Sequence, residues 1–292
     1  MTDDKMTGHP AAGRVWFITG TSSGFGRALS RAVLARGERV VATARDLAAI
    51  TDLLEAAPDR VLTARLDVTD PPSVRAAVAA ALATFSRIDV LVNNAAYGLL
   101  GAFEELTDAQ LRHEFETNFF GALTVTREVL PVLRRQRSGH IVQMSSVNGV
   151  VPGPGGTAYA GSKFALEGMS ESLAGEVAHL GIGVTIVEAG PFRTEFGGRG
   201  LAWGEPMADY ATLIGPARAA FEASHGSQPG DPDRGAEAII AAVGMEHPPL
   251  RLPLGAEAFA AIRGYLGGRL AGLDAVEPAG ADTAFRVPAR LA

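Results

Sequence analysis

The chain has 292 residues, 47% of them hydrophobic and 20% charged, which is the composition of a globular protein with a large core. Its 26 basic and 32 acidic residues give a net charge of −6 without a basic stripe, so we expect no nucleic-acid partner. The absence of cysteine excludes disulfides and thiolate chemistry, the scattered histidines predict no metal site, and no apolar run is long enough for a membrane span.

In chain order, short β-prone runs alternate with helical patterns. Residues 1–12 carry no signal pattern and are expected to be a disordered lead-in of a cytoplasmic protein. Strands are expected at residues 14–19, 39–44, 61–66, 89–92, 140–144, 184–188 and 250–254. Helices are expected at residues 28–34, 47–56, 73–85, 108–137, 157–180, 207–221, 233–245 and 256–270. Pro131 should kink or break the fourth helix.

This alternation predicts an α/β fold, in which a doubly wound parallel sheet forms the centre. About seven strands would lie side by side, with helices on both faces. We expect a single domain over residues 13–273, followed by a Pro/Ala-rich tail over residues 274–292. Ligands bind such sheets beyond the carboxyl ends of the strands.

A glycine-rich turn joins the first expected strand to the first helix. It reads Gly20-Thr21-Ser22-Ser23-Gly24-Phe25-Gly26, with the spacing G-x-x-x-G-x-G. Such a turn suits a dinucleotide phosphate, because glycines let the backbone approach closely and the helix N-terminus offers free N–H groups. Asp67, Asn93, Ser146 and Gly190 end other strands and so fall at the same edge of the sheet.

Tyr159 and Lys163 lie four residues apart on one helix and therefore share a face. A fixed ammonium favours phenolate, so we expect Lys163 to lower the pKa of Tyr159 toward the working pH. A tyrosine tuned in this way can act as a general acid/base, and Ser146 could hydrogen-bond the same substrate oxygen. The alternative for the pair alone is an exposed tyrosine beside a lysine that extends into solvent.

Together these residues resemble the classical short-chain dehydrogenase/reductase family, in particular its branch of 17β-hydroxysteroid and retinol dehydrogenases. The matching positions are Thr19-Gly20-x-x-x-Gly24-x-Gly26, Asp67, Asn93-Asn94-Ala95, Asn118, Ser146, Tyr159-x-x-x-Lys163, Gly190-Pro191 and Thr194. Three features, namely Phe25, Ala96 and the inverted pair Gly190-Pro191, depart from the family pattern, but none removes a reactive group. The resemblance implies a Rossmann-type fold, hydride transfer between a nicotinamide cofactor and a carbonyl/alcohol pair, and a homodimer or homotetramer.

The resemblance also implies catalytic roles. Tyr159 would exchange a proton with the substrate oxygen, and Lys163 would tune it and bind the nicotinamide ribose. Ser146 would orient the carbonyl, and Asn118 would hold a water of a proton relay. The expected cofactor-binding residues are Gly20, Thr21, Ser22, Ser23, Gly24, Phe25, Gly26, Arg45, Asp67, Val68, Asn94, Ala95, Ala96, Tyr159, Lys163, Pro191, Phe192 and Thr194.

The end of the second expected strand bears on the choice of cofactor. Ala44 stands where NAD-using relatives carry aspartate, and Arg45 follows with a guanidinium that suits a 2′-phosphate. This favours NADP(H) over NAD(H), with hydroxyls of Thr21 or Ser22 as further donors. Asp46 would pair with Arg45 or cap the next helix. Asp67 and Thr194 likewise have a capping alternative to their cofactor roles.

Residues 195–233 resemble the family's substrate lid. The expected apolar lining is Phe196, Leu201, Trp203, Met207, Tyr210 and Leu213, with further walls from residues 97–103 and 147–154. This set predicts a small hydrophobic ketone or secondary alcohol as substrate, without a charged clamp, and Arg193 is the nearest cation. A cofactor-binding regulator without turnover is the competing function, and the presence of Ser146, Tyr159 and Lys163 argues against it.

Overall fold

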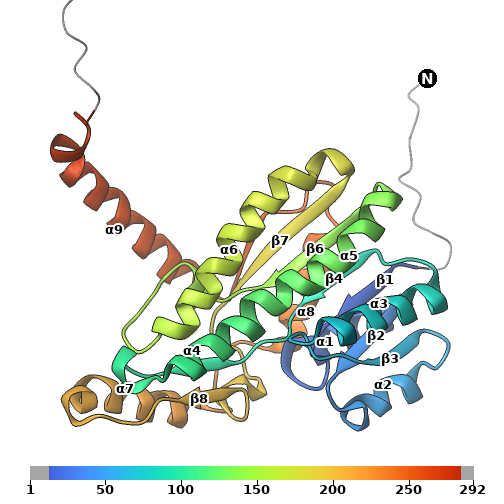
Figure 1. Cartoon of the computed structure of the whole chain (residues 1–292), viewed down its shortest axis with the longest axis horizontal. Helices are drawn as coiled ribbons and strands as arrows, with labels where there is room; N and C mark the ends of the chain where they lie inside the picture. The colour runs from blue at the N-terminus through green and yellow to red at the C-terminus, as the bar shows by residue number, and fades with distance from the viewer. Residues whose placement is uncertain (1–12, 284–292) are drawn as a thin grey trace, which may run out of the picture.

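The structure is a computed structural model, which describes residues 13–283. Its centre is a parallel sheet of seven strands in the order β3-β2-β1-β4-β6-β7-β9 (Figure 1). The strands are β1 (Val15–Ile18), β2 (Arg39–Ala44), β3 (Val61–Arg65), β4 (Val90–Asn93), β6 (Gly139–Met144), β7 (Ile182–Ala189) and β9 (Arg251–Leu254). The order reverses between β1 and β4, which is the position at which such sheets bind ligands. The predicted fold class is confirmed.

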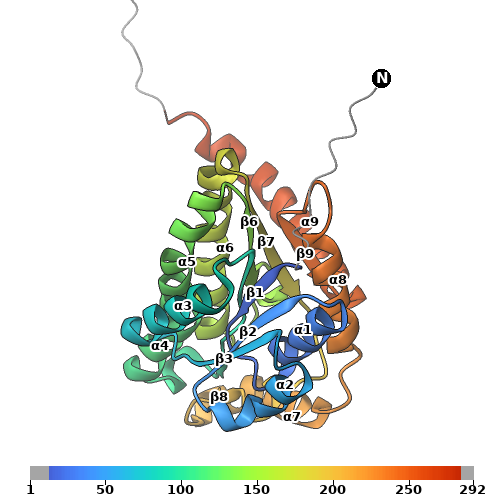
Figure 2. The same ribbon diagram turned by 90° about the vertical axis from the view of Figure 1, so that its right-hand side faces the viewer.

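Helices cover both faces of the sheet because its strands are apolar on both sides. One face carries α1 (Gly24–Ala35), α2 (Thr51–Ala56) and α8 (Pro232–Val243), and the other carries α3 (Pro71–Phe85), α5 (Ala122–Gln136) and α6 (Thr157–Val177) (Figure 2). Within β1, Trp16 and Ile18 enter the first core, while Val15 and Phe17 enter the second. This alternation follows from the period of two along a strand.

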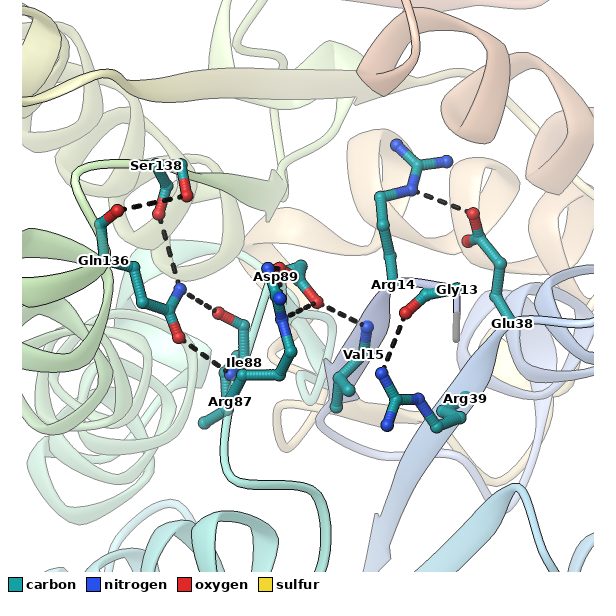
Figure 3. A network of polar contacts seen from close by, with 10 residues as sticks. All are labelled: Gly13, Arg14, Val15, Glu38, Arg39, Arg87, Ile88, Asp89, Gln136 and Ser138. Atoms are coloured by element: carbon teal, nitrogen blue, oxygen red, sulfur yellow. Dashed lines mark hydrogen bonds and ion pairs between the residues drawn. The ribbon is translucent and has the colours of Figure 1, made fainter. Parts of the chain in front are cut away.

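The amino ends of the strands are tied by polar side chains at the edge away from the carboxyl ends (Figure 3). Asp89 accepts a hydrogen bond from the backbone N–H of Val15 at 2.8 Å and pairs with Arg87. Gln136 at the end of α5 donates to the carbonyl of Ile88 at 2.7 Å. These contacts connect β1, β4 and α5 at this edge.

The long helix expected at residues 108–137 is divided, but not at Pro131. A capped helix α4 (Asp108–Phe115) is followed by a π-helical segment (Glu116–Gly121) and then by α5. α5 continues through Pro131, so a break there is wrong, and the alternative of a kink stays a prediction. The residue whose carbonyl loses its partner, Arg127, is exposed, so water can bind that carbonyl. π segments often occur at functional sites.

Two short strands were not expected from the sequence. β5 (Gly98–Leu100) and β8 (Leu201–Trp203) pair in parallel, with Leu99 opposite Ala202. The expected lid therefore begins with a 3₁₀ turn (Glu195–Gly197), contains a strand fixed to the segment after β4, and continues into α7 (Ala211–Ser224).

The C-terminal helix is longer than expected. α9 (Ala256–Gly280) includes residues 274–280, which were assigned to the tail. The rest of that tail beyond residue 283, and the lead-in at residues 1–12, lie outside the described residues. Within residues 13–283, no helix combines the length and the apolar character needed to cross a membrane.

Candidate active site

A cavity of about 810 Å³ opens at the carboxyl ends of the central strands. Of the residues predicted to bind a cofactor, those in its lining are Gly20, Ser22, Ser23, Gly24, Phe25, Arg45, Asp67, Val68, Asn94, Ala95, Ala96, Tyr159, Lys163, Pro191, Phe192 and Thr194. Ser146 lines it too. The fold thus brings together residues that are up to 174 positions apart in the sequence, between Gly20 and Thr194.

The glycine turn is shaped by backbone conformation and by one amide. Gly20 and Gly24 have φ of +71° and +54°, in the left-handed region that glycine favours. The Asn94 side chain donates to the carbonyls of Thr19 at 2.9 Å and Gly20 at 3.0 Å, which fixes the turn to the end of β4. A Cβ on Gly26 would lie 2.3 Å from the Gly20 oxygen and 2.5 Å from the Asn94 nitrogen. Gly26 is therefore required by packing.

Two predicted cofactor residues lie outside the cavity lining, Gly26 and Thr21. The Thr21 hydroxyl is buried and donates to the carbonyl of Thr43 at 3.2 Å, so it is not directed at a ligand. The aromatic residue of the turn has a clearer function. The rings of Phe25 and Phe192 lie 4.8 Å apart, which joins the glycine turn to the segment after β7.

The charged residues after β2 and β3 have two roles. Asp46 and Asp67 cap turns, whereas Arg45 makes no ion pair in the described part of the chain. Asp46 accepts from the backbone N–H of Ala48 at 3.0 Å and caps the next 3₁₀ turn. Asp67 accepts from the backbone and hydroxyl of Thr69 at 3.0 and 2.7 Å. Burial acts to raise the pKa of Asp67, but the Thr69 hydrogen bonds and the charge of Arg45 hold that pKa below its usual value. Asp67 is thus an ionised cap in the cavity wall.

Tyr159 and Lys163 lie side by side in the first turns of α6. Both are buried, and the Lys163 ammonium is 5.7 Å from the centre of the tyrosine ring. It donates to the carbonyl of Met144 at 2.8 Å, so the end of β6 fixes its position. Ser146 follows that strand, and its hydroxyl accepts from the backbone N–H of Asn148 at 3.2 Å.

The expected lowering of the tyrosine pKa is wrong for this structure. Burial raises the pKa of Tyr159 above its usual value, and the Ser146 hydroxyl opposes this only in part. Burial also lowers the pKa of Lys163 to about 8, although the carboxylates of Glu114 and Glu167 act in the other direction. Desolvation thus outweighs the attraction between an ammonium and a phenolate. Both groups hold their protons at neutral pH.

Asn118 lies on the π segment, behind the cavity wall. Its amide oxygen accepts from the backbone N–H of Tyr97 at 3.0 Å, and its nitrogen donates to the Tyr97 carbonyl at 2.8 Å. The side chain therefore fixes the chain between β4 and β5. With these bonds made, the Asn118 side chain has little capacity left for the relay water expected of it.

Glu114, a residue not predicted from the sequence, is a fully buried carboxyl one helical turn before Asn118. One oxygen accepts from the Asn118 amide at 3.1 Å, and the other has no hydrogen-bond partner within residues 13–283. Burial raises the pKa of Glu114 to about 8, and the charge of Lys163 opposes this. The sequence feature that could have indicated Glu114 is its spacing of four residues from Asn118, which places both polar groups on one helix face.

A second group of charges, which we call the Arg251 cluster, lies behind the serine pair, and two of its carboxylates, those of Glu167 and Glu188, are buried. Its members are Glu167 and Glu171 on α6, Glu188 on β7 and Arg251 on β9. Ser145 donates to Glu167 at 2.5 Å, and Arg251 contacts the other oxygen of that carboxylate at 2.6 Å. The hydroxyl of Ser145 is thereby occupied by Glu167, whereas that of its neighbour Ser146 accepts a backbone N–H and is directed at Tyr159.

The expected lining of the lid is only partly correct. Phe196 and Leu201 line the cavity, and the Phe196 ring is 5.4 Å from the ring of Tyr159. The other four expected residues lie outside the lining because their side chains either contact other residues of the protein or are exposed to solvent. Trp203 contacts Phe221 and Arg218, Tyr210 hydrogen-bonds Glu104, and Met207 and Leu213 are exposed. Of the other expected walls, the residues in the lining are Tyr97, Leu100, Val147 and Asn148.

Charged residues also lie in the part of the cavity lining near the lid, where the sequence predicted a substrate site without a charged clamp. Arg199, Glu195 and His113 belong to the lining, and Arg199 lies 3.9 Å from Glu195. Arg193, the expected nearest cation, is not in the lining and donates to the Gln228 carbonyl at 3.2 Å. Arg199, six residues after Arg193, is the arginine of this segment that lies in the lining.

A buried carboxylate fixes the first part of the lid. Glu105 accepts from the backbone N–H of Ala102 at 2.8 Å and from that of Met207 at 2.9 Å. Nearby, the N–H of Gly204 donates to the Leu100 carbonyl at 2.8 Å. β8 and the residues up to Met207 are therefore attached to the body of the protein, whereas α7 beyond them is largely exposed.

The comparisons with known proteins agree with this arrangement. Residues 14–203 match the family model described as short chain dehydrogenase. Retinol dehydrogenase 8 of Homo sapiens is 38% identical over 259 residues, which cover 82% of this chain and 81% of that protein.

Solved structures are similar as well. A short-chain dehydrogenase from Streptomyces avermitilis has a TM-score of 0.87 and 44% identity, covering 93% of this chain and all of the other. A short chain dehydrogenase/reductase from Burkholderia phymatum, solved in complex with NAD, has a TM-score of 0.78 and 24% identity, covering 90% and 95% of the two chains. At this identity the second likeness shows the fold alone.

Proposed function

Because the chain belongs to the short-chain dehydrogenase/reductase family of oxidoreductases, we propose that it transfers a hydride between NADP(H) and a hydrophobic ketone or secondary alcohol, with Tyr159 as general acid/base. The observation that carries the proposal is the placement of Ser146, Tyr159 and Lys163 in the wall of one cavity that also contains the glycine turn. The same geometry would serve NAD(H), which is the second candidate cofactor. A regulator without turnover would not need this buried triad.

The residues around the glycine turn fit a dinucleotide. The left-handed Gly20 and Gly24 leave room beside α1, whose first turn has no acidic residue to neutralise its positive end. Ser22, Ser23 and Arg45 would hold the phosphates. Asp46 is engaged as a cap, so the Arg45 guanidinium is free to accept a 2′-phosphate. When bound, a nicotinamide supplies hydride donor and acceptor chemistry, and the NAD complex of a fold neighbour supports a cofactor of this class.

Residues of the chain would transfer the proton that accompanies the hydride. A tyrosine whose pKa is raised is protonated at neutral pH and can donate its proton to a carbonyl oxygen that gains charge. The Ser146 hydroxyl would donate a hydrogen bond to the same oxygen and fix its position. Lys163, with a pKa of about 8, is mostly charged at neutral pH and would stabilise the phenolate left behind.

The substrate end of the cavity is apolar near the tyrosine and charged at its margin. Phe196, Leu201 and Leu100 would exclude water from the reacting carbonyl. Arg199 and Glu195 lie at a segment that is more exposed. A hydrophobic substrate that carries one polar group away from the carbonyl fits this distribution.

Cofactor binding is the first test. NADPH and NADH would be titrated separately, with nicotinamide fluorescence as the signal, into wild type, Arg45→Ala and the control Arg31→Ala. Loss of a charge-assisted phosphate contact should weaken NADPH binding about 10- to 100-fold and leave NADH and the control unchanged. If wild type bound NADH as tightly as NADPH or more tightly, NAD(H) would be assigned as the cofactor instead. Failure of both cofactors to bind would refute hydride transfer.

Activity is the second test, with a panel of aliphatic and aromatic ketones and the corresponding secondary alcohols. Tyr159→Phe removes the proton donor but keeps the ring that packs on Phe196. Its kcat should fall about 10²- to 10⁴-fold with cofactor affinity retained. Turnover within twofold of wild type would exclude Tyr159 as the acid/base.

A further inference from the structure

The C-terminal helix α9 leaves the body of the protein after its first turns. Figure 1 shows only the beginning of α9 beside the rest of the chain. Ala258 and Ile262 are buried at this base, whereas every residue from 266 to 280 is exposed. At about 1.5 Å per residue, the exposed part of the helix is about 20 Å long.

This exposed part carries an apolar stripe. Leu266, Leu270 and Leu273 are 51%, 61% and 63% exposed, and their spacing of four and three residues places them on one face. The same segment contains Gly267, Gly268 and Gly272, each of which costs about 1 kcal/mol relative to alanine in a helix. A short, glycine-rich helix is marginal in water by itself. Its stability therefore requires that the stripe be covered.

We propose that α9 pairs with α9 of a second copy of this chain in an antiparallel, two-fold arrangement centred on Leu270. In this register the two Leu270 side chains meet at the axis, and Leu266 of each copy lies within one residue, about 1.5 Å along the helix, of the position opposite Leu273 of the other. The stripe is thus self-complementary, as a two-fold interface requires. It lies apart from the faces of α5 and α6 that the family resemblance suggested for association.

The charges on α9 identify the occupant and the direction. From residue 263 onward, the basic residues Arg263 and Arg269 precede the centre and the acidic residues Asp274 and Glu277 follow it, whereas Glu257 lies at the base of the helix. Within residues 13–283, Arg263 and Glu277 have no ion pair. An antiparallel pair places Arg263 of one copy opposite Glu277 of the other, and it does so twice. A parallel pair would place like charges side by side.

The position of the protein body supports the same direction. Each body is attached at the amino end of its α9 (Figure 1). An antiparallel pair therefore holds the two bodies at opposite ends of the paired helices, where they do not collide. A parallel pair would bring both bodies to the same end.

Because the chain contains no cysteine, a single introduced thiol tests the axis directly. Leu270→Cys would be oxidised mildly and analysed by denaturing electrophoresis, with Ala275→Cys, on the opposite face of α9, as the matched control. We expect at least tenfold more covalent dimer from Leu270→Cys, since residue 270 meets itself across a two-fold axis. Equal cross-linking of the two variants, or none, would overturn the proposal in favour of another occupant such as a lipid surface or a different protein.

A second measurement does not depend on oxidation. Leu266→Glu combined with Leu270→Glu should halve the mass in solution determined by light scattering, whatever other interface the protein uses. Arg263→Glu and Glu277→Arg should each weaken association about two- to tenfold, and the double reversal should restore it. An unchanged mass, or a double reversal no tighter than either single variant, would refute the pairing. Cofactor binding should persist in all of these variants, which separates this test from the proposed function.

Discussion

Replacement of Glu114 by glutamine should change how the stability of the protein depends on pH. Glu114 is fully buried, and its pKa is about 8 in the folded protein against an ordinary value of 4.5. A carboxyl whose pKa is raised by folding contributes its full stability below the unfolded pKa and loses it as pH rises through the folded pKa. The wild type should therefore lose stability between pH 4.5 and about 8 because of this one group.

The difference of about 3.5 pKa units corresponds to about 5 kcal/mol above pH 8. The amide introduced by Glu114→Gln would be neutral throughout. It would, however, meet the position where one Glu114 oxygen has no partner, which costs about 1–3 kcal/mol at every pH. We therefore expect Glu114→Gln to be less stable than wild type by about 1–3 kcal/mol at pH 4.5 and more stable by about 2–4 kcal/mol at pH 8.5.

Urea unfolding of both proteins across this pH range measures the effect, with Glu116→Gln as a control on an exposed residue of the same helical region. Curves of stability against pH that run parallel for wild type and Glu114→Gln would refute the reasoning. Activity gives a second readout. The Glu114 carboxylate raises the pKa of Lys163, so its removal should lower that pKa and shift the alkaline limb of the kcat profile to lower pH.

Two further substitutions test the packing around the site. Gly26→Ala would place a Cβ 2.3 Å from the Gly20 oxygen, so we expect a loss of about 1–3 kcal/mol and weak cofactor binding, whereas Gly168→Ala, with open space, should not destabilise. Calorimetry and NADPH titration check both variants. Arg251→Met would leave two buried carboxylates of the Arg251 cluster without their cation, at a cost of about 3–5 kcal/mol that shrinks in acid. A change below about 1 kcal/mol in urea unfolding would contradict this account.

The sequence allowed prediction of the central sheet because its strands are buried on both faces and therefore read as continuous apolar runs. The glycine turn and the Tyr159–Lys163 pair were found for a similar reason, since local spacing decides their geometry. β5 and β8 were missed because three residues carry no periodicity, and their pairing depends on a contact between segments about 100 positions apart. The break expected at Pro131 is absent, and the carbonyl that loses its helical partner belongs to Arg127, an exposed residue, so water can bind it.

The pKa shifts in the site were harder to predict from the sequence than the identity of the residues that form it. The spacing of Tyr159 and Lys163 indicates attraction between their charged forms, but burial decides the outcome, and burial depends on the whole fold. Glu114 was missed for the same reason, because nothing in its immediate neighbours distinguishes a buried carboxyl from a solvated one. The lid residues Trp203, Met207 and Leu213 show the converse error, since apolar character alone did not indicate which cavity they would line.

The attachment of the lid by Glu105 has a consequence for the range of substrates. The N–H groups of Ala102 and Met207 donate to the Glu105 carboxylate, and the N–H of Gly204 donates to the Leu100 carbonyl. The wall formed by β5 and β8 is therefore held in place and behaves as a fixed template with one shape. The part of the wall beyond Met207 makes no hydrogen bond to Glu105, so its shape can adapt to the substrate. Substrates should therefore be selected strictly for the size of the group that lies toward Leu100 and Leu201. The group that lies toward α7 can vary widely, so one rigid side and one adaptable side coexist in the same cavity.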